Sequence, residues 1–152
     1  LMNVLYGLYP MDQGEVYLDG KRISIREPSD AIGHGIGMVH QHFMLVQPFS
    51  VTQNIVLGKE PTGPFGILDM KKAADEVAQL SRQYGLTVDP AALIEDLSVG
   101  SQQRVEILKT LYRGAQILIL DEPTAVLTPQ EINELAAIIG NLTDSGKSTG
   151  YK

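Results

Sequence analysis

Two adjacent carboxylates follow an apolar run in the segment ILILDEPTAVLTP, residues 117–129. The run is of strand length and apolar throughout, which is typical of a strand buried on both faces of a sheet. Because successive strand residues point to opposite sides, Asp121 and Glu122 should face different neighbours. One carboxylate could bind Mg²⁺ through water while the other positions or deprotonates an attacking water. Taken alone, the Asp-Glu pair fits an acidic turn at a strand end better than a catalytic pair.

A second segment that could bind an anion is LSVGSQQRVEI, residues 97–107. Ser98 and Gly100 stand where a helix is expected to begin. The free N–H groups and the positive dipole end of a helix N-terminus attract anions. Serine is also a preferred helix cap, so this segment alone favours an ordinary cap over a phosphate site.

Composition and charge narrow the class of protein. The 152 residues suffice for one domain with a real core. Twelve Lys and Arg against 18 Asp and Glu give a net charge of −6, so nucleic acid and anionic bilayers should be repelled, and any bound anion must be held locally. The sequence has no cysteine, which excludes disulfides and thiolate metal sites. Its apolar runs are too short to span a bilayer.

Periodicity and breaker residues predict the elements that position these segments. Asp19-Gly20 is a favoured hairpin turn, and the cluster PTGPFG at 61–66 should interrupt the chain. We expect a helix with Leu1, Val4, Leu5 and Leu8 on one face that stops at Pro10, short helices at 27–31 and 51–57, strands at 36–39 and 117–120, an irregular loop at 41–50, and helices at 69–85, 98–114 and 128–140.

The helix from Thr128 has the clearest start signal. Thr128, Pro129 and Glu131 form a capping box with proline at the first helical position. Gly140 is its expected end, and its expected buried stripe is Ile132, Leu135, Ala136 and Ile139. Strand and helix are not expected to alternate further after this helix.

In chain order, the segments at 97–107 and 117–129 resemble the signature motif, the Walker B strand and the D-loop of an ATP-binding cassette (ABC) ATPase. The segment GMVHQHFMLVQPFSVTQNIVLG, residues 37–58, is similar to the family's Q-loop region. The resemblance covers residues 1 to 143. In detail, LSVG and AVLTPQE look like the first cassette of the tandem subunits of simple-sugar and nucleoside importers.

This resemblance implies a fold and a set of site residues. The fold would be a partial P-loop NTPase-like ABC cassette of α/β class over residues 1–152, with a mixed sheet and a helical subdomain at roughly 68–114. Asp121 would bind Mg²⁺ through water, Glu122 would be the catalytic carboxylate, and Gln41 would reach both the metal and the attacking water. The residues that would close over the ATP of an opposite cassette are Ser98, Gly100, Ser101 and Gln102.

The resemblance also implies cofactors, partners and a location. ATP and Mg²⁺ would be the cofactors, and hydrolysis would drive uptake of nucleosides or simple sugars. The partners would be a second cassette, transmembrane permease subunits and, indirectly, a substrate-binding protein, with no nucleic acid. The protein would lie at the cytoplasmic face of the cell membrane.

The sequence departs from the family pattern at several positions. Val99 and Ser101 replace the usual glycine and glutamine of the signature, and Thr128 replaces the usual aspartate of the D-loop. The phosphate-binding loop should precede Leu1 directly, and the switch histidine should lie on a strand after Lys147. The strand at 117–120 would therefore lack these two family neighbours in the sheet. We therefore expect no hydrolysis above background and only weak nucleotide binding from this chain alone. A non-catalytic interaction module is the alternative. A soluble ABC ATPase of translation or DNA repair is disfavoured, because the Q-loop has no large insertion and the net charge is acidic.

The motif SGKST at residues 145–149 raises a further alternative. A phosphate-binding loop ends in Gly-Lys-Ser or Gly-Lys-Thr, so a circular permutation could place it here. The spacing argues against this, because Gly140 lies one residue too far from Gly146 and the segment follows a helix instead of a strand. An ordinary helix-to-strand turn is favoured.

Overall fold

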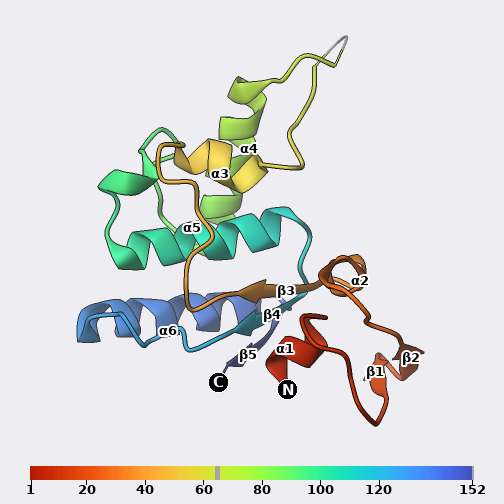
Figure 1. The fold of residues 1–152 in the computed structure, drawn as a ribbon. Coiled ribbons are helices and arrows are strands. Elements are labelled where there is room, and N and C mark those ends of the chain that lie inside the picture. Colours follow the sequence, from red (N-terminus) through yellow and green to blue (C-terminus); the bar gives the residue numbers. More distant parts are fainter. Residues whose placement is uncertain (64–65, 152) are drawn as a thin grey trace.

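The computed structural model describes residues 1–63 and 66–151, so the predicted breaker cluster at 61–66 lies partly outside the described residues. Figure 1 shows the arrangement of the elements. In chain order they are α1 (Met2–Leu5), β1 (Val16–Leu18), β2 (Lys21–Ile23), α2 (Pro28–Gly33), β3 (Ile36–Val39), α3 (Val51–Val56), α4 (Met70–Tyr84), a 3₁₀ turn η2 (Ile94–Asp96), α5 (Val99–Tyr112), β4 (Ile117–Leu120), α6 (Pro129–Asp144) and β5 (Ser148–Tyr151).

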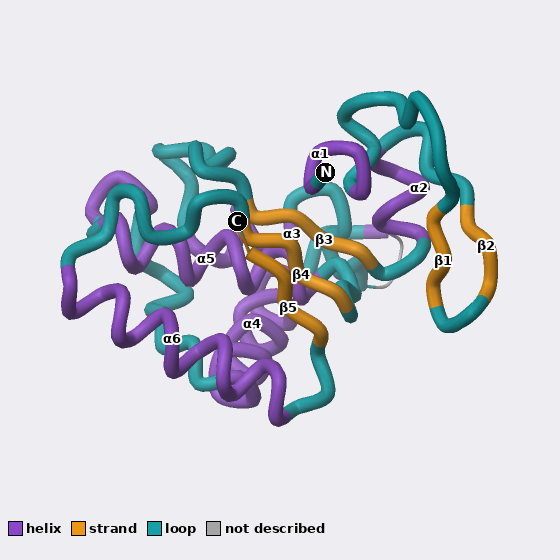
Figure 2. Tube along the Cα trace, turned by 90° about the horizontal axis from the view of Figure 1, so that it is seen from below, coloured by secondary structure: helices purple, strands orange, loops and turns teal. Residues whose placement is uncertain are grey.

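A parallel sheet of β3, β4 and β5 forms the centre of the molecule, with β4 in the middle (Figure 2). Leu120 of β4 is in register with Val39 on one side and with Tyr151 on the other. Because β5 follows α6 and pairs with β4, the expectations that strand and helix alternate no further and that 117–120 lacks the strand after Lys147 are wrong. The turn after α6 returns the chain to the sheet, because the Ser148 N–H donates to the Gln116 carbonyl at 2.9 Å.

The two faces of the sheet are covered by different helices. Leu118 and Leu120 belong to a large core with α3, α4, α5 and α6, whereas Ile119 packs in a smaller cluster with α1 and α2. This alternation follows from the pleat, and it confirms the prediction that the apolar run is buried on both faces. In Figure 1, α5 lies between the sheet and the pair formed by α3 and α4.

Local capping signals set most of the boundaries as predicted. Asp69 caps α4 by accepting from the Lys72 N–H, and Gly85 ends α4 in the left-handed conformation at φ +67°. Ser98 caps α5. The hairpin β1–β2 turns at Asp19 and Gly20, both at positive φ, so that the two-residue turn matches the strand twist.

Two predicted helix ends are wrong. Helix α6 runs through Gly140 to Asp144, and its buried residues are Leu135, Ile138 and Leu142, whereas Ile132 and Ala136 are exposed. The buried face at i, i+3 and i+7 offsets the cost of an interior glycine, which is about 1 kcal/mol.

Helix α1 ends at Leu5, before the predicted stop at Pro10. Gly7 takes φ +81°, and a Cβ there would lie 2.5 Å from the backbone of Glu27. The close approach of these two segments ends the helix, and it leaves Leu1 and Leu8 exposed.

No helix in the described part of the chain combines the length and the apolar character needed to cross a bilayer.

Candidate functional site

The carboxyl ends of the three parallel strands meet at one edge of the sheet. Asp121 directly follows β4, and its N–H donates to the Val39 carbonyl of β3 at 3.0 Å. Gln41 lies two residues after β3 at the same edge. The parallel register thus brings together the ends that carry Gln41, Asp121 and Glu122, and Figure 2 shows the C-terminal end of β5 at this edge as well.

Glu122 lies in a turn instead of on an extended strand. Its backbone takes φ +47°, in the left-handed region, and its side chain is exposed. A non-glycine residue there costs roughly 1–2 kcal/mol. The strand alternation that the sequence suggested therefore stops at Asp121, and this turn sets the direction of Glu122. Backbone strain of this kind is concentrated at functional sites.

A cavity of about 320 Å³ opens beside Asp121 at this edge. It is lined by residues from the start of α1, the end of β4 and the end of β5, namely Leu1, Met2, Asn3, Asp121 and Tyr151. Mg²⁺ keeps several waters and is usually held by one or two carboxylates together with substrate phosphates. One half-exposed carboxylate beside an open cavity fits that mode of binding.

A protein-only metal cage has no support in the described residues. Nowhere in the described ranges do three His, Cys, Asp or Glu side chains gather closely enough to hold a metal ion.

The predicted anion-binding residues lie together at the start of α5, where some of their hydrogen-bonding groups already have partners within the chain. The Ser98 hydroxyl accepts from the Ser101 N–H at 3.2 Å, which is the ordinary cap interaction. The Gln102 side-chain amide donates to the Leu97 carbonyl at 3.1 Å and so holds the segment that precedes the helix. The Gly100 N–H donates to Glu131 Oε1 at 3.1 Å.

Glu131 is a site residue that the sequence did not reveal in this role. Its carboxylate accepts from the Thr128 N–H at 2.9 Å, as the capping box predicts, and in addition from Gly100. The hydrogen bond from the Thr128 backbone is the main cause that lowers the pKa of Glu131. A Cβ at position 100 would lie 2.5 Å from Glu131 Oε1, so the contact requires glycine there.

Further polar contacts join α5 to the segment that follows β4. Buried Gln103 donates from its side-chain amide to the Pro123 carbonyl at 2.8 Å, and Arg104 forms an ion pair with Glu134. The start of α5 and the turn that carries Glu122 are thereby linked within one chain.

Lys147 of the SGKST motif lies at the opposite end of the strands, where β4 begins. Its amine donates to the Ala115 carbonyl at 3.0 Å and to Gln116 Oε1 at 2.8 Å, and both of these residues precede β4. Asp121 follows β4, so the lysine cannot serve a phosphate beside Asp121. The motif is the helix-to-strand turn that its spacing favoured.

Comparison with known proteins decides the family. A family model described as ABC transporter matches residues 1–125. The chain belongs to the ABC transporter family. The structure is similar to the crystal structure of MJ1267, an ATP-binding cassette of an ABC transporter in its ADP conformation, with a TM-score of 0.82 at 21% identity over 99% of this chain and 63% of that one. The predicted α/β cassette fold is confirmed.

The relatives in sequence are import ATP-binding proteins. The chain is 59% identical over 148 residues to the guanosine import ATP-binding protein NupO of Bacillus subtilis. It is 61% identical to the nucleoside import ATP-binding protein NupA of Lactococcus lactis, and 43% identical to the ribose import ATP-binding protein RbsA of Caldanaerobacter subterraneus. These matches cover 97–99% of this chain but only 29–30% of each relative.

Proposed function

We propose that the protein is the ATP-binding and ATP-hydrolysing subunit of an ABC importer, and that its substrates are nucleosides. The hydrolytic part of the proposal is supported by Gln41, Asp121 and Glu122 following strands that end at the same edge, with an open cavity beside Asp121. The difference in identity, 59–61% to nucleoside or guanosine importers against 43% to a ribose importer, supports nucleosides over sugars.

Each residue at the edge has a distinct role in this proposal. Bound MgATP would supply the phosphoryl group whose transfer to water drives transport. Asp121 would hold the metal-bound water, Glu122 would orient and deprotonate the attacking water, and Gln41 would contact both. The family's phosphate-binding loop, expected directly before Leu1, would then enter the cavity that Leu1 and Asp121 both line.

The start of α5 would act on the ATP of an opposite cassette. Ser98, Gly100 and Ser101 would face that nucleotide with a hydroxyl and N–H groups once their present bonds to one another and to Glu131 are exchanged, and Gln102 would hold the preceding segment in place. Residues 68–114 would form the helical subdomain, since α4 packs against α5 away from the sheet (Figure 1).

The partners in this proposal are a second cassette, permease subunits and, through them, a substrate-binding protein. The location is the cytoplasmic face of the membrane, in line with the import ATP-binding proteins to which the chain is similar. A net charge of −6 disfavours nucleic acid as a partner.

A non-catalytic interaction module is the second candidate. It is favoured by one contact, since the Gly100 N–H that would face the opposite ATP is already bound by Glu131. Hydrolysis by the whole protein separates the two candidates.

Uptake in cells that contain the whole transporter tests the substrate. We expect radiolabelled guanosine or uridine to accumulate and an excess of unlabelled nucleoside to compete, whereas ribose and glucose should not. The control is Asp121→Asn, which should abolish uptake without lowering the amount of protein. Competition by ribose alone would overturn the substrate class, and nucleoside uptake at the normal rate in Asp121→Asn would overturn the hydrolytic assignment.

A further inference from the structure

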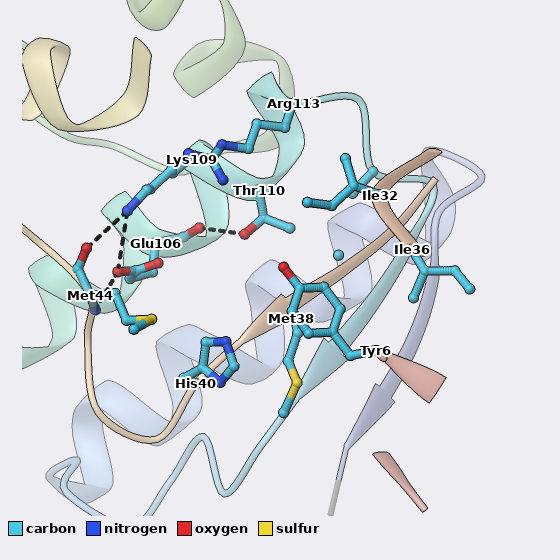
Figure 3. Close-up of a pocket in the computed structure, with 12 residues that line it drawn as sticks. Tyr6, Ile32, Ile36, Met38, His40, Met44, Glu106, Lys109, Thr110 and Arg113 are labelled. Carbon is cyan, nitrogen blue, oxygen red and sulfur yellow. Dashed lines mark hydrogen bonds and ion pairs between the residues drawn. The ribbon is translucent and has the colours of Figure 1, made fainter. Parts of the chain in front are cut away.

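The segment between β3 and α3 has no helix or strand, yet the middle of it is held by side chains. The Met44 N–H donates to Glu106 Oε1 at 2.8 Å, and Lys109 Nζ donates to the Met44 carbonyl at 2.9 Å. Figure 3 shows both contacts as dashed lines around Met44. Two side chains of α5 thus bind both polar backbone groups of one loop residue, and we call this pair of contacts the Met44 clamp.

The clamp is buried and charged. The side chains of Glu106 and Lys109 are only 7% and 12% exposed, and they approach each other to 3.9 Å one turn apart on α5. Burial lowers the pKa of Lys109, while the nearby Glu106 charge opposes this shift. Charges are rarely buried without partners, so a charged pair directed at a loop backbone indicates a specific task for that loop.

The next part of the loop is held in the same manner from another helix. The Val46 N–H donates to Asn54 Oδ1 at 2.7 Å, and Asn54 Nδ2 donates back to the Val46 carbonyl at 3.0 Å. Asn54 lies on α3 and is fully buried, and Leu45 between the two held residues is buried too. The backbone from 44 to 46 is therefore fixed, whereas the side chains of Gln41 and His42 are exposed.

A cavity of about 90 Å³ lies on the sheet side of the clamp. Met38, His40 and Thr110 are among the residues that line it, together with Met44, Glu106 and Lys109 (Figure 3). Between β3 and the clamp, Phe43 packs against the large core and His40 meets the Tyr6 ring edge-on at 5.8 Å, so the clamp adds polar contacts at the end of a segment that is partly packed.

We propose that Glu106 and Lys109 are positioning residues that hold Gln41 at the carboxyl edge of the sheet. The proposal rests on the role of Gln41 given under the proposed function. Helix α5 begins at the Ser98 cap and carries the clamp on its second and third turns. A single rigid element then connects the residues that face an opposite ATP with the loop that serves this chain's own site.

Hydrogen exchange at the Met44 amide tests the clamp without reference to activity. In the whole protein, Glu106→Ala and Lys109→Met should each speed exchange of peptides covering 41–45, by about tenfold or more for Glu106→Ala, because a hydrogen bond to a charged group is lost. Glu106→Gln and Lys109→Arg keep an acceptor and a donor and should restore slow exchange. Asp75→Asn and Lys71→Met on the exposed face of α4 are matched controls. Unchanged exchange in Glu106→Ala would overturn the clamp.

A double-mutant cycle tests whether the clamp acts through Gln41. Glu106→Ala should lower kcat for ATP hydrolysis about tenfold with little change in KM, and it should cause no further loss in a Gln41→Ala background, because residues that act as a unit are not additive. Glu106→Gln should recover most of the rate. Equal losses with and without Gln41 would show a general structural role and overturn the proposal.

The two proposals fail in different ways. If the wild-type protein hydrolyses no ATP, or if Gln41→Ala leaves the rate unchanged, the proposed function of the edge fails and the functional half of this inference fails with it. The exchange measurements still decide whether the clamp exists. If hydrolysis is normal and depends on Gln41 but not on Glu106, only the present inference is wrong.

Discussion

At the scale of single residues, Glu122 has the most unusual backbone in the site. It is exposed, lies at φ +47°, and comes two residues after β4, whose last three residues are buried. A strained turn that presents a carboxylate at a sheet edge is expected for a group that must contact a substrate. The structural alternative, an acidic turn without function, would leave Glu122 replaceable.

Glu122→Gln in the whole protein should lower the rate of hydrolysis by about 10²–10⁴-fold, because the amide keeps its size but cannot deprotonate water. Binding of MgATP should persist, since Asp121 is untouched. Single-turnover hydrolysis measured separately at the site that contains Glu122 checks this, with Asp144→Asn at the exposed end of α6 as the control. A wild-type rate in Glu122→Gln would remove Glu122 from the catalytic role.

Glu131 should make the free energy of unfolding depend on pH in the acid range. The ordinary pKa of a glutamate is 4.5, and in the folded chain hydrogen bonds from Thr128, and to a smaller extent from Gly100, lower the pKa of Glu131 below that value. Because the folded chain binds the proton less tightly, the contribution is fully present above pH 4.5 and is lost as the pH falls through the lower folded value. Urea unfolding of wild type and Glu131→Gln should therefore differ at neutral pH and converge in acid. A constant difference would contradict this.

At the scale of elements, the close approach of β3 and α5 decides how the sheet and the helices fit together. Gly37 lies where a Cβ would come 2.9 Å from Ala115 Cβ and closer still to Thr110 Cγ2. Glycine is therefore required in the middle of a buried strand, and the strand in turn sets the height of α5 above the sheet. The Met44 clamp depends on that height.

Gly37→Ala should destabilise the chain by about 1–3 kcal/mol, the usual cost of overpacking. Thr110→Ala removes one of the two obstacles and should recover part of that loss, so that the double variant is more stable than Gly37→Ala alone. Thermal unfolding of the three variants measures this, and Gly33→Ala, where a Cβ would meet open space, is the control. Simple additivity of the two substitutions would contradict the proposed overpacking.

At the scale of the whole molecule, local signals predicted much more than tertiary ones. The caps at Asp69, Ser98 and Thr128 and the hairpin at Asp19 followed from chemistry within a few residues. The residue pattern alone does not indicate strand β5, because Ser148–Tyr151 reads STGY, which has little apolar character, and it is a strand because β4 offers a free edge. Propensity in strands is dominated by such context.

The features of the candidate site also separate into those that the sequence predicts and those that only the tertiary structure reveals. The carboxyl edge that joins Gln41 to Asp121 could be predicted once two parallel strands were assigned, because such ends coincide. The contacts of Glu131 with Gly100 and of Glu106 with Met44 could not be predicted, because each joins residues far apart in sequence through a side chain with an ordinary local role.

The outer edge of β5 should make the chain self-associate when it is studied alone. In the described residues the sheet order is β3-β4-β5, so β5 pairs on one side only, and Tyr151 at its end is 68% exposed. Open edges pair with other chains. Light scattering should show mass increasing with concentration, and Tyr151→Lys should reduce this, whereas Tyr17→Lys on the hairpin should not. A monomer at all concentrations would contradict the prediction.

The cavity beside Asp121 also has a consequence for the order of folding. Strands β4 and β5 are joined by one helix, so their pairing closes a short loop, whereas the start of α1 meets the ends of β4 and β5 across most of the chain. Contacts that close long loops form late. The cavity needs all three parts, so the site should be among the last features to appear during folding, and its first appearance would report that the chain has reached its native topology.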